Sequence, residues 1–198
     1  NQMEGERIIL RPVSLDDAED MYEYTSDEET TRFIYEPHKD LNQTKTVIAN
    51  YFVKEPIGKY AIVLKENNKM VGAIEFRVHE WNKSGDLGFT LNRHFWGKGY
   101  MTEAGKLILG LAFDVLGLER VYAGHEVKNS ASGKVLIRLG MKCEGILRKD
   151  QMIKGKFGGK KTREDIIQTT NEAVDAARAC GALTIGVNAE DASRSDIN

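Results

Sequence analysis

The stretch His94-Phe-Trp-Gly-Lys-Gly-Tyr-Met-Thr-Glu-Ala104 decides the fold, because it places two glycines at the start of a long segment with helical periodicity. The residues before it, Asp86–Asn92, alternate between apolar and small or polar side chains, as a short strand does. The residues after it repeat apolar side chains at helical spacing: Met101, Ala104, Leu107, Ile108, Leu111, Ala112 and Val115. The sequence therefore predicts a strand, a glycine loop and a helix that ends near Leu116.

The two glycines indicate a place where a ligand can approach the backbone. Gly97 and Gly99 have no Cβ, and both tolerate positive φ. The N–H groups of the first helical turn have no partner within the helix and point toward such a ligand, which suits a phosphate. The alternative is that the glycines are only turn residues. Thr102 stands where a dinucleotide fingerprint has its third glycine, and the Lys-Ser/Thr pair of a P-loop is missing.

Two motifs together resemble the GNAT family of N-acetyltransferases, especially the branch that acetylates the N-termini of ribosomal proteins. The first is His94-x-x-Gly-x-Gly99, which is similar to the family's Gln/Arg-x-x-Gly-x-Gly/Ala loop for the pyrophosphate of acyl-CoA. The second is Asn129-Ser-Ala-Ser132, followed by Arg138-Leu-Gly-Met141 and Glu144-Gly145. The resemblance covers about residues 6–157.

The resemblance implies an α+β fold with a mixed, mostly antiparallel central sheet flanked by helices. Residue patterns agree with it, because β-branched runs alternate with helical periods along the chain. The predicted elements are, in order, a strand at 7–11, a helix capped by Ser14, a helix at 41–53, a hairpin of 60–64 and 70–78, the strand, loop and helix described above, a parallel strand at 121–125, a helix at 130–139 and a strand at 142–154 that turns at 155–159.

The C-terminal part differs in kind. We expect residues 1–161 to form the acetyltransferase domain and residues 162–198 to form an atypical helix-strand extension, because the family's last strand is missing from its usual place. Leu183–Val187 is expected to pair with the sheet of its own chain or of a partner in a homodimer; the alternative is a disordered tail. Residues 173–196 resemble a piece of the isopropylmalate and homocitrate synthases, but so short a piece cannot form a barrel of about 250 residues, so no synthase function follows.

The composition bounds the class of protein. With 198 residues and 41% hydrophobic composition, the chain suffices for one globular domain with a core. A net charge of −2 argues against nucleic-acid binding, and no apolar run is long enough to predict a membrane span. The N-terminus has no secretion pattern, so we expect a cytoplasmic location. Cys143 and Cys180 lack metal-type spacing, and we expect free thiols and no metal site.

Acetyl-CoA is the co-substrate that the resemblance implies. The backbone of the loop and first helical turn would hold its pyrophosphate: Gly97, Lys98, Gly99, Tyr100, Met101 and Thr102. The strand before the loop would line the pantetheine arm and offer an N–H to the thioester carbonyl: Phe89, Thr90 and Leu91. His94 stands where the family has Gln or Arg, and it would donate a hydrogen bond or be a surface histidine. Asn129 would bond the pantetheine arm, or cap the helix that follows it.

Acetyl transfer to an amine needs a positioned donor, a base, support for an oxyanion and a proton for the thiolate. Amines have pKa values of about 8 to 10.4, so a base must take a proton near neutral pH. Glu75, Asp86 and Asp150 are the acidic candidates, and Glu75 is unusual within an apolar strand unless it faces solvent. Ser132 is the proton donor that the resemblance suggests, because Leu136 stands where many members have a tyrosine; its alternative role is a hydrogen bond at the helix start.

The sequence thus predicts an N-acetyltransferase that moves the acetyl group of acetyl-CoA to a primary amine by direct attack through a tetrahedral intermediate. The alternative is a non-catalytic acyl-CoA-binding module, which the missing tyrosine and the altered C-terminal strand favour. Both predict CoA binding, and only the enzyme predicts thiol release when an amine is supplied. The acceptor stays open among a protein N-terminal amine, a polyamine and an aminoglycoside, because acceptor loops vary independently of the CoA site.

Overall fold

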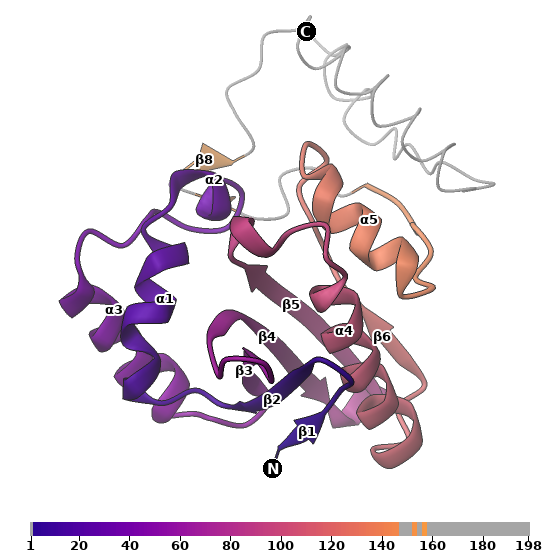
Figure 1. The fold of residues 1–198 in the computed structure, drawn as a ribbon. Coiled ribbons are helices and arrows are strands. Elements are labelled where there is room, and N and C mark those ends of the chain that lie inside the picture. The colour runs from indigo at the N-terminus through magenta and orange to yellow at the C-terminus, as the bar shows by residue number, and fades with distance from the viewer. Residues whose placement is uncertain (1, 147–151, 154–155, 158–198) are drawn as a thin grey trace, which may run out of the picture. The chain divides into compact units, whose positions relative to one another are not determined.

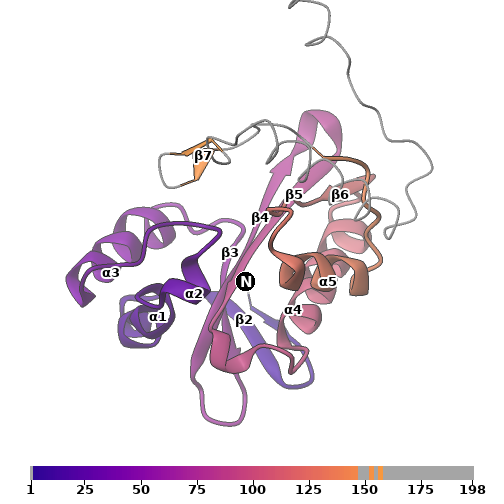
Figure 2. The same ribbon diagram turned by 90° about the horizontal axis from the view of Figure 1, so that it is seen from above.

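The computed structural model describes residues 2–146, 152–153 and 156–157. Residues 1–140 form one compact unit. Its centre is a six-stranded sheet in the order β1-β2-β3-β4-β5-β6, with α1 to α3 over one face and α4 and α5 over the other (Figures 1 and 2). The predicted α+β class, a mixed and mostly antiparallel sheet flanked by helices, is confirmed.

The elements have the following bounds. The strands are β1 (Met3–Glu4), β2 (Ile8–Pro12), β3 (Lys59–Leu64), β4 (Met70–His79), β5 (Ser84–Leu91) and β6 (Arg120–Tyr122). The helices are α1 (Ala18–Thr25), α2 (Glu28–Thr31), α3 (Leu41–Val47), α4 (Tyr100–Gly110) and α5 (Ser130–Arg138). The π-helical segments Ile48–Val53 and Leu111–Val115 continue α3 and α4. Neighbours from β1 to β5 are antiparallel, and β6 is parallel to β5. No helix in the part of the chain that the structure describes is long and apolar enough to cross a membrane.

The sheet buries both of its faces, because successive side chains of a strand point to opposite sides. On β3, Ile62 and Leu64 pack toward α4, whereas Ala61 and Val63 pack toward α1. The buried face of α4 and its continuation is the predicted one, with Met101, Ala104, Ile108 and Ala112. Val115 does not follow the prediction. It is 73% exposed, because the wider π-helical turns carry it off the apolar stripe.

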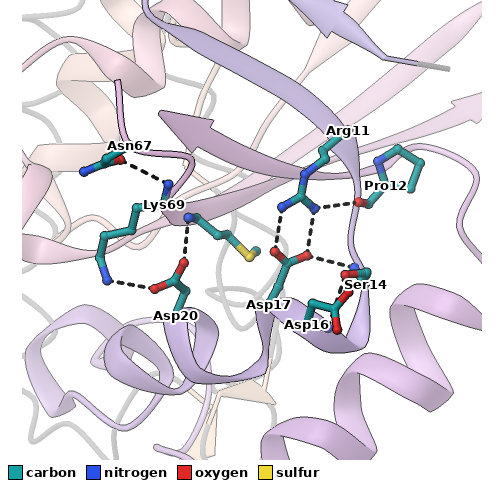
Figure 3. A network of polar contacts seen from close by, with 9 residues as sticks. Arg11, Pro12, Ser14, Asp16, Asp17, Asp20, Asn67 and Lys69 are labelled. Carbon is teal, nitrogen blue, oxygen red and sulfur yellow. Dashed lines mark hydrogen bonds and ion pairs between the residues drawn. The ribbon is translucent and has the colours of Figure 1, made fainter. Parts of the chain in front are cut away.

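The entry into α1 is fixed by a buried carboxylate, as Figure 3 shows. The guanidinium of Arg11 donates to both oxygens of Asp17, at 2.8 and 2.7 Å, and the backbone amide of Ser14 donates to the same side chain at 2.8 Å. Asp17 is only 4% exposed. The predicted N-cap at Ser14 is confirmed, and the contact also ties the start of α1 to β2, which the sequence pattern does not indicate.

A second polar cluster joins α1 to β4 (Figure 3). The ammonium of Lys69 donates to Asp20 at 2.8 Å and to Glu23 at 2.7 Å, and the backbone amide of Met70 donates to Asp20 at 2.9 Å. These bonds hold the middle of α1 beside the first residue of β4. The position of α1 is therefore set by two charged contacts in addition to its apolar face.

The predictions for the residues after Gly140 are confirmed only in part. The strand predicted at 142–154 is wrong for residues 142–146, which have no regular secondary structure. Apolar residues alternate too weakly there for the sequence pattern alone to specify a strand. β7 (Met152–Ile153) pairs antiparallel with β8 (Lys156–Phe157), which confirms a reversal of the chain near Gly155. The extension at 162–198, its boundary at 161 and its strand at 183–187 lie outside the described residues and stay predictions.

Asp17→Asn is expected to lower the free energy of unfolding by about 2 kcal/mol, because the amide cannot accept both bonds of Arg11 and leaves a half-buried guanidinium without its charge partner. The matched control is Asp16→Asn, since Asp16 is exposed and adjacent. Urea denaturation of both variants measures the difference. Equal stability of the two variants would contradict the structural role of Asp17.

Candidate active site

The open edge of β5 is the feature around which the site is built. β5 pairs with β4 along its whole length, from Ser84 to Leu91, but with β6 only at Ser84–Asp86. Among the described strands, none continues the pairing on the β6 side from Leu87 onward. The backbone groups of that edge can therefore bond an extended ligand that carries amides, as the pantetheine arm of CoA does. Phe89, Thr90 and Leu91, which were predicted to line this arm, all lie on the open part.

The predicted glycine loop follows directly after this edge. Gly97 and Gly99 have φ values of 76° and 84°, which side chains other than glycine rarely adopt. Gly99 is the N-cap of α4, and no side chain caps its first turn. Gly97, Lys98 and Gly99 are exposed. The amides that open α4 are thus oriented by the helix and free of a capping side chain, which is the geometry that a pyrophosphate needs.

The side chains in the first turn of α4 have structural roles. Met101 is 4% exposed and packs in the core between α4 and the sheet, where Tyr100 also packs. Thr102 is half-buried. Any contact of Tyr100 and Met101 with CoA must therefore come from their backbone, as the sequence predicted.

Arg7, to which the sequence assigned no function, stabilises the glycine loop through hydrogen bonds. Its guanidinium donates to the carbonyl of Lys98 at 2.9 Å and to Glu103 at 2.9 Å, and lies 4.7 Å from the centre of the Tyr100 ring. Its backbone amide donates to the other oxygen of Glu103 at 2.8 Å. Arg7, the residue just before β2, therefore fixes both the glycine loop and the first turn of α4. Burial opposes ionisation of Glu103, but the bonds from Arg7 outweigh it and lower the pKa of Glu103.

A second support reaches the loop from α1. Asn92 is 1% exposed; its amide donates to Glu23 at 2.9 Å, and its side-chain oxygen accepts from the backbone amide of His94 at 3.1 Å. Hydrogen bonds from Lys69 and then from Asn92 lower the pKa of Glu23. The indole of Trp96 donates to the carbonyl of Leu91 at 2.7 Å, which folds the loop back on the end of β5.

The side chain of His94 lies next to the glycine loop. Its ring is exposed and makes no hydrogen bond with the described residues. It lines an open depression of about 280 Å³ together with Glu29, Arg93 and Trp96. Both sequence interpretations of His94 therefore stay open, since an exposed ring beside the loop is able to donate to a phosphate.

Glu75 does not face open solvent. It lies on β4 two residues after Ala73, so it shares the face of the sheet that α1 and α3 cover. The phenol of Tyr51 donates to its Oε2 at 2.5 Å, and Tyr51 comes from the π-helical segment after α3. Such segments occur often at functional sites. The fully exposed interpretation of this carboxylate is wrong, and a hydrogen-bonded, half-buried one replaces it.

Three phenols lie near this carboxylate, and all are protonated at neutral pH. Burial, followed by the hydrogen bond with Glu75, raises the pKa of Tyr51 to about 12. Burial raises the pKa of Tyr35 to about 12, against a hydrogen bond with Thr90 and with a contribution from the charge of Glu75. Burial raises the pKa of Tyr24 well above its ordinary value. The surroundings of Glu75 therefore consist of neutral phenols with strong dipoles.

Gly88 leaves room beside this carboxylate. It is the partner of Glu75 in the β4–β5 register, and a Cβ built on it would meet no atom within 4 Å. Gly88 also belongs to the open part of β5. The open space over Gly88 thus lies between Glu75 on β4 and the open edge of β5.

The other predicted residues are only partly placed. The side-chain oxygen of Asn129 accepts from the backbone amide of Ser132 at 3.1 Å, so Asn129 caps α5, and its amide nitrogen stays available for a ligand. Ser132 is half-buried in the first turn of α5. Leu136 is 8% exposed and belongs to the core. Asp86 pairs with Arg77 at 2.6 Å, which favours a structural role. Asp150 lies outside the described residues.

Acetyl-CoA fits the arrangement of loop, open strand edge and uncapped helix start described above. Within the described residues, no group of three or more His, Cys, Asp and Glu side chains is arranged to hold a metal ion. Cys143 is a free thiol, and Cys180 lies outside the described part of the chain.

The contacts that sequence reasoning missed join residues far apart in the chain. Arg7 and Glu103 are 96 residues apart, and Glu23 and Asn92 are 69 apart. A sequence pattern carries no signal for such pairs. Tyr51 lies in the helix predicted at 41–53. The helical spacing of the apolar residues there predicts that Tyr51 packs against its neighbours, and it does not predict the hydrogen bond with Glu75.

Comparison with known proteins agrees with this geometry. Residues 7–142 match the family model described as an acetyltransferase (GNAT) domain. The chain is 31% identical over 157 residues to an uncharacterized N-acetyltransferase, p20, of Bacillus licheniformis, and the match covers 77% of this chain and 88% of the relative. The structure of a GNAT-family acetyltransferase from Bacillus anthracis is similar with a TM-score of 0.71 at 25% identity, covering 79% of this chain and 92% of that one.

Two further similarities are to a solved acetyltransferase structure and, over a short segment, to a synthase. The microcin C7 self-immunity acetyltransferase MccE, solved in complex with acetyl-CoA and AMP, has the same fold, with a TM-score of 0.65 at 22% identity over 76% of this chain and 87% of that one. A short match of 48 residues is 60% identical to citrate (Re)-synthase of Dehalococcoides mccartyi. It covers 24% of this chain and 12% of the synthase, so the activity of the synthase is not carried over to this chain. It agrees in part with the predicted resemblance to related synthases.

Arg7→Ala is expected to weaken CoA binding about tenfold, because the loop loses the charged hydrogen bonds that fix its carbonyl side. Arg7→Lys should give an intermediate affinity, since an ammonium keeps the pair with Glu103 but not the fork. Lys106→Ala, on the exposed side of α4, is the control for loss of one positive charge. Isothermal titration calorimetry measures the three affinities, and equal values for Arg7→Ala and Lys106→Ala would refute the bracing role.

Proposed function

Since this chain belongs to the GNAT acetyltransferases, we propose that it moves the acetyl group of acetyl-CoA to a primary amine by direct attack. The observation that carries this proposal is the place of Glu75. It lies one strand inside the open edge of β5, beside the free space over Gly88, and it accepts a hydrogen bond from a neutral phenol. A carboxylate in that place can take a proton from an amine that approaches the edge.

The proposed cofactor site follows the chain from β5 into α4. The amides of Gly97 to Thr102 bind the pyrophosphate, with Lys98 and His94 at its exposed side. The open edge at Phe89 to Leu91 binds the pantetheine arm and presents an N–H to the thioester carbonyl. The amide of Asn129 bonds the arm from the start of α5. Backbone donors that are fixed before the reaction stabilise a developing oxyanion without reorganisation.

The proposed reaction balances as follows. Glu75 takes a proton from the ammonium form of the acceptor, directly or through water, and the neutral nitrogen attacks the thioester carbon. The nitrogen of the tetrahedral adduct loses its second proton to solvent, the oxyanion collapses, the carbon–sulfur bond breaks, and the thiolate takes a proton from the hydroxyl of Ser132. Glu75 releases its proton to solvent. Ser132 recovers its proton from solvent. The products are an N-acetylated amine and free CoA.

The acceptor is proposed to be a primary amine of a protein N-terminus or of a small molecule. The motif at Asn129–Ser132, which resembles the branch that acts on ribosomal-protein N-termini, supports the first class. The second class is supported by the open space over Gly88, which a small amine can enter. The cytoplasmic location and the homodimer stay predictions, as does a catalytic role of Asp150.

The alternative is an acyl-CoA-binding module without catalysis, and the buried Leu136 in place of a tyrosine favours it. The deciding experiment incubates the protein with acetyl-CoA and a panel of amines, in which a peptide with a free N-terminus, a polyamine and an aminoglycoside are represented. Thiol release is followed with a colorimetric reagent. Release that depends on an amine supports the enzyme, whereas CoA binding without release under any condition supports the module.

Glu75→Gln is expected to lower kcat at neutral pH at least about 100-fold, because a positioned general base contributes on that order. Loss of the carboxylate should also remove the limb of the rate profile that rises with pH, while the affinity for CoA stays unchanged. Glu55→Gln is the matched control, since Glu55 is nearby but 76% exposed. A wild-type pH profile in Glu75→Gln would exclude this residue as the base.

Ser132→Ala is expected to lower kcat more than it raises the KM for acetyl-CoA, because a proton donor acts chiefly in the transition state. The backbone amide of residue 132 still bonds Asn129 in this variant, so the cap of α5 is kept. Ser130→Ala in the same exposed turn is the control. Steady-state kinetics separate the two parameters, and an unchanged kcat would leave Ser132 with a structural role only.

A further inference from the structure

Two cationic side chains flank the carboxylate of Glu75 without neutralising it. Lys59 is its direct partner in the β3–β4 register, so both side chains leave the sheet on the same face. Cross-strand partners have Cβ atoms about 5 Å apart, which is well within reach of an ion pair. Arg77 lies two residues further along β4 on that face. Neither cation bonds Glu75: Lys59 bonds Tyr51, and Arg77 bonds Asp86.

The ammonium of Lys59 is held by Tyr51. It lies 3.7 Å from the centre of the Tyr51 ring and donates to the carbonyl of the same residue at 2.7 Å. The side chain of Lys59 is only 11% exposed, and its nearest carboxylate contact, with Glu55, is long at 3.9 Å. A buried ammonium on an aromatic face gains from the negative face of the ring. Arg77 is held in a comparable way by Asp86, at 2.6 Å.

Tyr51 therefore touches both charges at once. Its hydroxyl donates to Glu75, and the face of its ring carries the ammonium of Lys59. We propose that Tyr51 is a positioning residue that keeps Glu75 available as the base, because it satisfies the carboxylate with a neutral donor and holds Lys59 away from it. The inference rests on the proposed function in so far as Glu75 is that base.

The chemical consequence is a difference in base strength. An ammonium bound to the carboxylate would stabilise its charged form strongly, so that it would take a proton from the acceptor less readily. It would also compete with the acceptor, which arrives as an ammonium itself. A phenol donor stabilises the charged form less, and its hydrogen bond goes to Oε2 only, while the register partner of Glu75 is Gly88, over which a Cβ would meet no atom within 4 Å.

Other groups around Glu75 do not replace this arrangement. Tyr24 from α1 and Tyr35 from the segment after α2 are neutral at working pH, and the charge of Glu75 contributes to the raised pKa of each. Among the described residues, Arg77 is the other cation that interacts with Glu75, and it stays paired with Asp86. Lys59 is thus the cation whose release would change Glu75 most.

The test uses four variants of the full chain: Tyr51→Phe, Tyr51→Ala, Tyr51→Ala with Lys59→Met, and Tyr51→Ala with Lys54→Met. Tyr51→Phe removes the hydroxyl donor but keeps the ring under the ammonium. Tyr51→Ala also removes the ring and opens the space between Lys59 and Glu75. Lys54 is an exposed lysine close in sequence, and its replacement is the control for a general loss of positive charge.

Two readouts are measured for each variant: the midpoint of the Glu75 carboxyl titration by carbon-13 NMR, assigned with Glu75→Gln, and the acid limb of the kcat/KM profile with the best amine. Tyr51→Phe should move both to higher pH by about one unit, because a hydrogen bond to the charged form is lost. Tyr51→Ala should move both to lower pH by about one unit, because Lys59 then pairs with the carboxylate. It should also lower kcat/KM at neutral pH about tenfold.

Adding Lys59→Met to Tyr51→Ala should reverse the shift and restore most of the rate, whereas adding Lys54→Met should do neither. A shift of Tyr51→Ala in the same direction as Tyr51→Phe, or no reversal by Lys59→Met, would overturn the inference, since Lys59 would then remain with Glu55 or the backbone. If the wild type releases no CoA with any amine, the proposed function fails, and the NMR midpoints alone still decide the role of Tyr51.

Discussion

The structure depends on the point at which β5 and β6 part. Pairing that continued to Leu91 would satisfy the backbone of β5 and leave nothing for a ligand to bond. Because the pairing ends at Asp86, no described strand covers the edge of β5 from Leu87 to Leu91. Unpaired edges are normally a liability, and proteins cover or blunt them. An edge that is kept open beside an uncapped helix start is consistent with a ligand that bonds both.

The glycine loop is not rigid by itself. Gly97 and Gly99 have positive φ in the structure, but glycine can adopt many other backbone conformations in a free chain. Its geometry is imposed by neighbours on both sides. Arg7 fixes the carbonyl side of the loop to α4, and Asn92 fixes its entry to α1. Both contacts use charged groups that are only partly exposed, where hydrogen bonds are stronger than in water. The amides that open α4 are therefore already oriented, and a ligand that bonded them would lose less entropy on binding.

The sequence predicted most elements of the first 140 residues because their apolar residues follow the periods of strands and helices closely. The capping pair of Ser14 and Asp17 and the helix after Gly99 are examples. It failed where local pattern and environment diverge. Val115 fits the helical period but is exposed after a π-helical turn, and residues 142–146 were predicted as part of a strand but have no regular secondary structure. The glycine loop was found because its function requires glycine itself. The bonds from Arg7 and from Tyr51 were not, since they depend on tertiary distance alone.

The two halves of the proposed site lie on different features of one strand. In the proposed site, the backbone edge of β5 binds the acetyl donor. The amine acceptor lies on the face of β4 and β5 that α1 and α3 cover. Gly88 belongs to both the edge and the face. A side chain at position 88 would separate them. The same face carries Lys59 and Arg77, which a sheet of alternating charges would pair with Glu75. Because Lys59 bonds Tyr51 and Arg77 bonds Asp86, neither cation forms an ion pair with Glu75, whose register partner on β5 is Gly88. That selection of partners is consistent with chemistry at this carboxylate rather than with stability alone.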